Sequence, residues 1–383
     1  MSKKIHPRMI HKSILFASVL FALLISVRAM QPPPKKNNVK IVELKSAQLW
    51  AKHPRLDAIL LRDSVVLYHE GAYMYCDSAY LFETTNSFEA FSNVVMEQGD
   101  TIFVYGDYLF YDGNTRLARL RDNIRMEDQQ VTLFTDSLNY DRMANLGYYF
   151  EGGMLVDEKN ELTSFWGQYN PDNKDALFSN TVKLTNEDFT IFSDTLKYNT
   201  ESKIADILGP STIVSDSGFI VTSKGWYNTD SEDARFYDRS EIYSSDTTKV
   251  LIGDTIFYNR LSGIGDVYGN MYMEDLKQKV ILRGGYGTYN EKTEYGMATD
   301  SAYVVDYAQS DSLFLHGDTL QMFTDSIYKD IKAFYNVRFF RNDMQGVCDS
   351  MNYVQRDSIL YLVGEPVIRN GGNQVCLFER YDH

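Results

Sequence analysis

The chain has 383 residues and a formal net charge of −14, with 38 Lys and Arg against 52 Asp and Glu. Hydrophobic residues make up 44% of it, which is typical of a folded protein and excludes a globally disordered chain. The acidic balance argues against a nucleic-acid partner, and the 28 Tyr and 22 Phe favour β structure.

Residues 1–29 have the pattern of a secretory signal peptide. Basic residues open the segment, an apolar run extends from Ile14 to Val27, and Val27-Arg28-Ala29 fits a small-residue cleavage site. The run is short for a membrane-spanning helix, which needs ~20 residues, although an uncleaved anchor is the alternative. Removing its five basic residues leaves 33 basic against 52 acidic groups, a net charge of −19 (33 − 52). The proline-containing residues 30–40 are expected to form a flexible lead-in.

One short phrase recurs through the rest of the chain. Its first residue is Asp in seven of ten copies, its fifth is Tyr in eight of ten, and successive copies lie 29 to 33 residues apart. A fixed period of this length is typical of a repeat architecture in which similar units stack on one another. The first residues of the ten copies are Asp77, Asp107, Asp136, Phe165, Asp194, Ser223, Asp254, Gly285, Asp318 and Asp349.

Alternation within each copy predicts strands. In "FSDTLKYN", alternate residues share a face. One face holds Phe192, Asp194, Leu196 and Tyr198, and the other holds Ser193, Thr195 and Lys197. No segment after residue 40 sustains a helical stripe. The sequence therefore predicts an all-β fold of about ten ~30-residue strand–turn–strand repeats over residues 41–370, an eleventh degenerate unit near Ser46, and an irregular tail over 371–383.

The repeated Asp is expected to lie at a bend between strand segments, where its carboxylate accepts backbone N–H groups in an Asx-type turn. Asn or Gly recurs in the second half of the units, at Asn93, Asn123, Gly152, Asn180, Gly209 and Gly269. A catalytic role is disfavoured because seven units carry the Asp, and a calcium-binding β-roll is disfavoured because its Gly-rich nonapeptide is absent. The expected bend residues are Asp77, Asp107, Asp136, Asp194, Asp254, Asp318 and Asp349.

The repeated Leu and Tyr positions allow two interpretations. Stacking places equivalent residues side by side, so they form either a closed, self-filled core or the lining of an apolar groove wide enough for acyl chains. Gly167, Gly225 and Gly287 replace large residues in alternate units, which either leaves room for a ligand or accommodates bulky neighbours. The candidate lipid-contacting residues are Leu109, Tyr111, Leu138, Tyr140, Leu196, Tyr198, Ile256, Tyr258, Leu320, Met351 and Tyr353.

The repeat resembles the OstA-like (LptA-type) family of periplasmic lipopolysaccharide-transport proteins. The similarity lies in "TDSLNY", "SDTLKY", "GDTIFY" and "CDSMNY", followed by strands such as "SNVVME", "DNIRME" and "GNMYME". The resemblance implies an elongated β-jellyroll or V-shaped β-solenoid with an apolar interior. It also implies a periplasmic location, with outer-membrane association left open. The implied partners are lipopolysaccharide or a related glycolipid and other bridge proteins that stack edge to edge.

Enzyme motifs are not recognisable in the sequence. The six His residues are scattered, and no hydrolase, nucleotide-binding or zinc-protease arrangement occurs. The three Cys, at 76, 348 and 376, match no zinc spacing, and we expect a fold that does not depend on disulfides. We therefore expect a non-enzymatic protein without cofactor or metal. The alternative to lipid transport is a structural or adhesive β-solenoid that binds protein or carbohydrate on its outer face.

Overall fold

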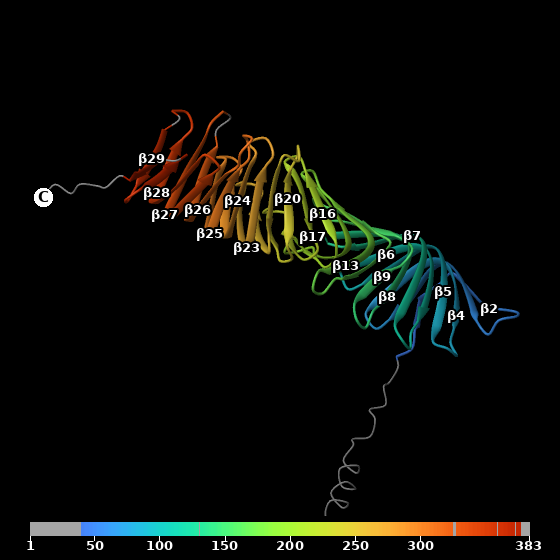
Figure 1. Cartoon of the computed structure of the whole chain (residues 1–383). Helices are drawn as coiled ribbons and strands as arrows, with labels where there is room; N and C mark the ends of the chain where they lie inside the picture. The colour runs from blue at the N-terminus through green and yellow to red at the C-terminus, as the bar shows by residue number, and fades with distance from the viewer. Residues whose placement is uncertain (1–39, 130, 325–326, 358, 372, 377–383) are drawn as a thin grey trace, which may run out of the picture. The chain divides into compact units, whose positions relative to one another are not determined.

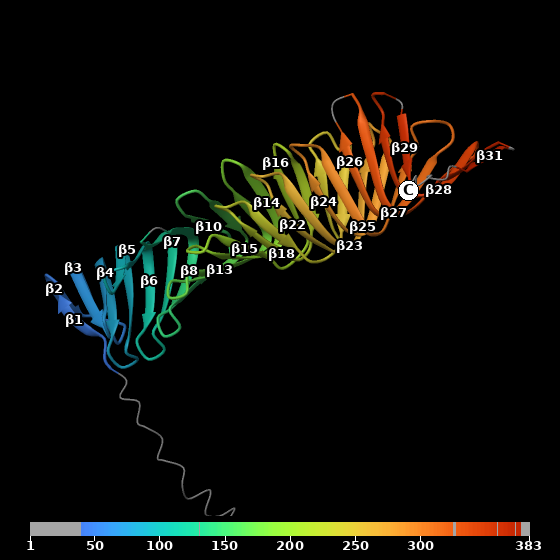
Figure 2. The ribbon, with the colours of Figure 1, turned by 90° about the vertical axis from the view of Figure 1, so that its left-hand side faces the viewer.

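The computed structural model describes residues 40–129, 131–324, 327–357, 359–371 and 373–376. The signal peptide and most of the lead-in expected from the sequence lie outside these residues. From Glu43 to Cys376 the described chain forms 31 strands joined in one antiparallel sheet. The strands follow one another in chain order along the stack, from blue to red in Figures 1 and 2.

Two kinds of strand build the stack. The long strands are β3 (Ile59–His69), β4 (Ala72–Phe82), β5 (Ser87–Gln98), β6 (Ile102–Asp112), β7 (Leu117–Asp128), β8 (Val131–Asp141), β13 (Asp175–Thr185), β14 (Phe189–Asn199), β23 (Ile264–Asp275), β24 (Val280–Asn290), β25 (Tyr295–Asp306), β26 (Leu313–Thr324), β27 (Lys329–Arg341) and β28 (Met344–Val354). The other strands are short, and most come as consecutive pairs that together replace one long strand.

The short strands are β1 (Glu43–Ser46), β2 (Leu49–Lys52), β9 (Leu146–Tyr149), β10 (Gly153–Val156), β11 (Glu161–Ser164), β12 (Trp166–Asn170), β15 (Ile204–Ile207), β16 (Ser211–Ser215), β17 (Gly218–Thr222), β18 (Gly225–Asn228), β19 (Asp233–Phe236), β20 (Ser240–Ser244), β21 (Lys249–Gly253), β22 (Thr255–Asn259), β29 (Ile359–Val363), β30 (Val367–Asn370) and β31 (Asn373–Cys376). Strands β1 and β2 both pair with β3, so the degenerate unit expected near Ser46 is present as a split strand.

Each long strand crosses between two walls of the sheet. The first half of β14 pairs with β16, whereas its second half pairs with β15. We call the wall that contains β16 wall 1 and the wall that contains β15 wall 2. The line where the strands cross is the corner, and the opposite side, where both walls end in turns, is the mouth. The two-walled, all-β architecture expected from the repeat is therefore confirmed.

The corner is built from an interrupted ladder. Pairing between β4 and β5 shifts at the crossing, and the shift brackets Asp77 on one strand and the pair Ser92 and Asn93 on the other. Both residues of that pair have positive φ, 60° and 49°, a conformation that Asn tolerates better than most residues. Of the turn residues noted in the sequence, Gly209 alone does not have positive φ.

The repeated Asp residues lie at this corner, mostly exposed, but their hydrogen bonds differ from those expected. Four of the carboxylates accept a side-chain amide of Asn from the next strand rather than backbone N–H groups: Asp77 from Asn93, Asp107 from Asn123, Asp254 from Asn270 and Asp318 from Asn336, at 2.5 to 2.9 Å. Beside Asp136 and Asp194, the neighbouring position is glycine, and Asp349 packs its Cβ against Gly364.

The expected Asx turns occur five residues later, at the mouth. Asp112, Asp141 and Asn199 each accept the backbone N–H groups of the two residues at positions +2 and +3. These residues directly follow the repeated Tyr. The carboxylate or amide oxygen caps a tight turn there because the chain must reverse direction between two paired strands.

Residues 371–383 were expected to be irregular, and this is wrong for residues 373–376. Strand β31 pairs with β30, and the pairing of Asn370 with Asn373 closes a tight turn that contains Gly371 at a φ of 57°. The Asn–Gly–Gly–Asn sequence is a common hairpin signal. The remaining tail lies outside the described residues.

Candidate functional site

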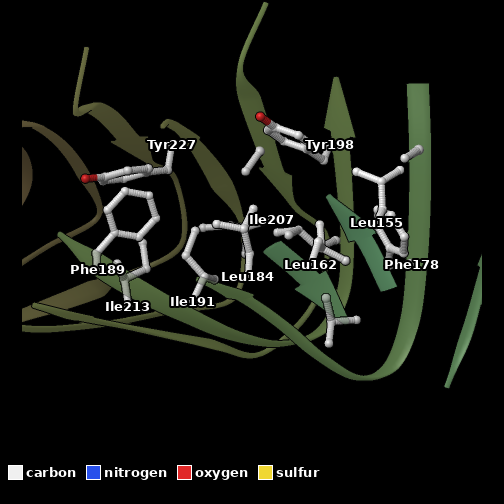
Figure 3. Packing of buried hydrophobic residues seen from close by; sticks show 14 of the residues in the cluster. Leu155, Leu162, Phe178, Leu184, Phe189, Ile191, Tyr198, Ile207, Ile213 and Tyr227 are labelled. Atoms are coloured by element: carbon white, nitrogen blue, oxygen red, sulfur yellow. The ribbon is translucent and has the colours of Figure 1, made fainter. Parts of the chain in front are cut away.

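The interior between the walls is the candidate site. Figure 3 shows Leu184, Ile191 and Ile207 meeting there from different strands, with Tyr198 and Tyr227 along one side. Nine of the eleven candidate lipid-contacting residues are buried, and Tyr258 and Tyr353 are half-buried. Eight of the nine, from Leu109 to Leu320, have 0% exposure. The structure therefore places all of these residues inside, but most of them contact protein rather than open space.

Glycines in the interior make room for neighbouring side chains. A Cβ on Gly167 would lie 2.5 Å from the hydroxyl of Tyr149, and one on Gly287 would lie 2.8 Å from the sulfur of Met271. On Gly225 it would meet the backbone of Arg235 at 2.3 Å. Of the two explanations for these glycines, accommodation of neighbouring groups fits the structure: a bulky side chain at Gly167 and Gly287, and backbone at Gly225.

The repeated Tyr closes the mouth. The Tyr198 hydroxyl on wall 2 donates to the carboxylate of Asp157 on wall 1 at 2.6 Å, and Lys203 donates to the same oxygen at 2.9 Å. One unit earlier, Tyr169 and Lys174 bind Asp128 at 2.7 and 2.8 Å. We call such a set a clasp, in which an acceptor on wall 1 meets the Tyr 41 residues later and a base five residues after that Tyr.

Similar contacts recur at separations of 40 to 42 residues with other side chains, and we call these clasps as well. The ring of His69 hydrogen bonds Tyr111 at 2.8 Å, and Gln98 donates to Tyr140 at 3.4 Å. Farther along the chain the charges are reversed, because Lys249 on wall 1 donates to Tyr289 and Glu294 on wall 2, both at 3.2 Å. The clasps join the two walls across the interior and exclude water from it.

Burial and hydrogen bonds together set the charge states of Tyr198 and Asp157 in their clasp. Burial raises the pKa of Tyr198, and donation to Asp157 raises it further, so this phenol stays neutral and donates. Burial alone would raise the pKa of Asp157, but the hydrogen bonds from Tyr198, Lys203 and nearby backbone groups lower it below its usual value. An ionised acid, a neutral phenol and a cation therefore meet at one buried point.

Sequence reasoning did not find the acid and the base of the clasp. Asp128, Asp157, Lys174 and Lys203 stand at turn positions, where charged residues are ordinary. The available signal was the constant spacing from the repeated Tyr, five residues to the base and 41 to the acid. This spacing becomes visible only when two separate units are compared, because each clasp joins neighbouring repeats.

Two cavities open between the walls in the later part of the stack. The first, about 290 Å³, is lined from wall 1 by residues such as Phe189 and Ile242 and from wall 2 by Tyr227 and Tyr258. The second, about 510 Å³, is lined by Leu315, Ile331, Phe339, Met351, Tyr353 and others. The second volume lies within the range of small-molecule sites, ~300 to 1,000 Å³, and the first lies just below it. Of the candidate lipid-contacting residues, only Tyr258, Met351 and Tyr353 line them.

Other kinds of site find no support in the described part of the chain. No group of three or more His, Cys, Asp or Glu there could hold a metal ion. Cys76 and Cys348 are buried, free thiols. Among the same residues there is no helix with the length and apolar character that a membrane crossing requires.

Comparison with known proteins gives one family match. Residues 36–194 match the model of the OstA-like protein family. A solved structure similar to this chain is LptH of Pseudomonas aeruginosa, described as the LptA-homologous periplasmic component of the lipopolysaccharide transport device. It has 13% identity and a TM-score of 0.27, over 34% of this chain and 95% of that one. No curated protein matches. Residues 36–194, which hold the first repeats, are therefore similar to the OstA-like family.

Proposed function

We propose that this protein shields the acyl chains of lipopolysaccharide or a related glycolipid inside its two-walled interior while the lipid crosses the periplasm towards the outer membrane. The observation that carries the proposal is the pair of cavities lined by apolar side chains from both walls. Ten methylene groups buried there would contribute ~8 kcal/mol before the costs of ordering. The role requires binding and release, and no enzymatic step.

The proposal limits where lipid is held. The interior from Leu61 to Ile207 is filled by the protein's own side chains, so a continuous trough through all repeats does not fit this conformation. The lipid would occupy the later part of the stack, between Phe189 and Leu360. A periplasmic location is supported by the signal-like residues 1–29 and by the family match.

Partners of the same kind would bind at the ends of the sheet. In the described residues β2 pairs only with β3, and β29 pairs only with β28. Both edge strands expose large apolar residues, including Trp50 at 70% and Val363 at 53%. An unpaired strand edge with apolar side chains is suited to pairing with another chain, and we propose edge-to-edge stacking with other bridge proteins there.

Photo-crosslinking would test the lipid proposal. A diazirine-bearing amino acid would replace Ile242 inside the first cavity, and in a matched control it would replace Phe192, which is 48% exposed on the outer face. After expression in a lipopolysaccharide-producing host, mass spectrometry should find glycolipid attached at position 242 and not at 192. Absence of lipid at position 242 would contradict the proposal.

A binding role for the outer face is the second candidate. It is favoured by the filled interior of the earlier repeats and by an open hollow of about 820 Å³ on the outside, lined by Phe192, Val221 and mainly polar neighbours. This structural or adhesive role predicts protein or carbohydrate binding that Phe192→Ala weakens and that a substitution at Ile242 does not change. A glycan array and a pull-down with both variants would separate the two candidates.

A further inference from the structure

The mouth has a break in its row of clasps. Two positions between the clasp at Asp157 and the clasp at Lys249 keep the repeated Tyr. They lack the acid and the base that complete the set at Asp157. At the first, the spacing aligns Asn186, Tyr227 and Glu232; at the second, it aligns Ser217, Tyr258 and Gly263. We call this stretch of the mouth the window.

Polar contacts across the window are few, and they include a hydrogen bond between Ser217 and Tyr258. Arg260 on wall 2 approaches Asp188 on wall 1 at 3.9 Å, but it is held more closely by Glu232 of its own wall at 2.7 Å. Asn186 uses its oxygen to cap its own turn, accepting the N–H groups of Asp188 and Phe189 at 2.9 Å. The two walls are therefore less tightly joined here than at Asp157.

The first cavity lies directly inside the window. Its lining includes Ser217, Tyr227, Tyr258 and Gly263 from the window itself, and the apolar Ile220 and Leu251 deeper in. A chain that enters between the walls here reaches apolar surface without displacing a clasp. The break in the clasps and the cavity thus coincide and share lining residues.

The Tyr227 hydroxyl is the unusual group in this cavity. Its side chain is 1% exposed, and its oxygen is buried without a hydrogen-bond partner. The ring packs edge-on against Phe189, with ring centroids 4.7 Å apart, as Figure 3 shows. A buried hydroxyl without a partner is unfavourable, so a ligand that supplies an acceptor would recover this loss.

We propose that the window is a side entrance for an ester- or amide-linked acyl chain, whose carbonyl oxygen accepts a hydrogen bond from Tyr227. The carbonyl stands at the head-group end of an acyl chain, and Tyr227 stands at the mouth end of the cavity, so the hydrocarbon points inward. The inference deepens the proposed function and rests on it.

The charges at the window favour recognition of the carbonyl over recognition of an anionic head group. Lys249, Arg260 and Lys277 are each paired with a carboxylate, at 3.2, 2.7 and 2.6 Å. Glu291 adds a further acid to the lining. A polar, uncharged group at the head end therefore meets no repulsion.

Two probes that differ in the carbonyl test this inference. Decanoyl sucrose carries an ester, whereas decyl maltoside has a ten-carbon chain and a neutral disaccharide without one. Isothermal titration calorimetry below the critical micelle concentrations should show the ester binding about tenfold more tightly to the full chain. Tyr227→Phe should remove this preference and leave decyl maltoside unchanged. Tyr198→Phe, whose hydroxyl is used in a clasp, should keep it.

A second variant closes the window without removing the phenol. Asn186→Asp with Glu232→Lys gives this position the acid and base found at Asp157 and Lys203. The Tyr227 hydroxyl then has a protein acceptor, so the ester preference should disappear and both probes should bind more weakly. A preference that survives in Tyr227→Phe or in the double variant would overturn the inference.

The outcomes separate this inference from the proposed function. Suppose that the wild-type protein binds both probes equally and that Ile242→Trp, which fills the cavity, abolishes the binding. The interior then holds lipid, but Tyr227 does not donate a hydrogen bond to the carbonyl. Binding that Ile242→Trp does not change would place the lipid elsewhere and overturn the side entrance. If neither probe binds, both the inference and the proposed function fail.

Discussion

Replacement of the acid in one clasp should loosen the stack locally. The Asp157 side chain is 0% exposed and accepts hydrogen bonds from Tyr198, Lys203 and Asn160. Asp157→Ala leaves the phenol and the ammonium without this acceptor. Both lie on wall 2, so the variant removes the charged part of the joint between the walls, and the hydrogen bond from Asn160 to the Tyr198 hydroxyl, at 2.9 Å, remains.

The expected cost follows from burial. Removing one partner of a fully buried ion pair costs ~3 to 5 kcal/mol, but Lys203 is 23% exposed and can turn partly to water. We therefore expect a loss of ~3 kcal/mol, close to the lower limit of that range. In a repeat protein this loss affects the neighbouring units rather than the whole chain.

Native-state hydrogen exchange measures such a local loss. Amides of β10, β11, β14 and β15 should exchange ~100-fold faster in Asp157→Ala, because 1.4 kcal/mol corresponds to a factor of ten. Asp230→Ala is the control: its ion pair with Lys159 is 60% exposed on both sides, so exchange should not change. Equal protection in wild type and Asp157→Ala would refute the reasoning.

The same variant gives a pH dependence. The pKa of Asp157 is lower in the folded chain than its ordinary value, so its contribution is present above ~pH 4. It is lost as the pH falls through the folded pKa, when the carboxylate takes up a proton. The difference in protection between wild type and Asp157→Ala should be constant from pH 5 to 8 and shrink below ~pH 4. A difference that grows as the pH falls would contradict this assignment.

Three other outcomes test the packing. Gly167→Val should lower the unfolding free energy by ~2 kcal/mol, because its Cβ would lie 2.5 Å from the Tyr149 hydroxyl. Urea titration measures this loss, and an unchanged midpoint would show that Tyr149 moves aside freely. Burial raises the pKa of Cys76 to about 12 and that of Cys348 to about 11, so a thiol reagent at pH 8 should label them only after unfolding, and rapid labelling of the native chain would contradict this. Leu196→Asp should unfold the units around β14 and reduce the β-sheet circular dichroism signal, because the side chain is fully buried in the filled interior. An unchanged signal would mean that this position is open.

The repeat made most of the fold predictable. A period near 30 residues, alternation of apolar side chains and recurrent turn residues are all local features, and together they imply stacked strands. The corner was predicted as a bend at positions such as Asp77, but not its partner Asn93, because the hydrogen bond joins neighbouring strands. The bend can be predicted from residues that are close in sequence, whereas the hydrogen-bond partner depends on which strands pair.

The site was harder to predict for the same reason. Leu196 and Ile256 were correctly placed inside, but periodicity does not distinguish a filled interior from a hollow one. That difference depends on the volumes of facing side chains, such as Tyr149 against Gly167. The clasp at Asp157 needed a comparison of residues 41 and 46 positions apart, and the window appears only as a departure from that pattern.

The equal separations in the clasps at Asp128 and Asp157 mean that the protein can change length in whole units there. Each of these two sets links one repeat to the next by the same offsets. Removing or duplicating one 29-residue period between these two clasps would preserve the same offsets on either side of the join. Evolution could therefore shorten or extend this molecule to suit the distance it spans, while the distinctive cavity units stay intact.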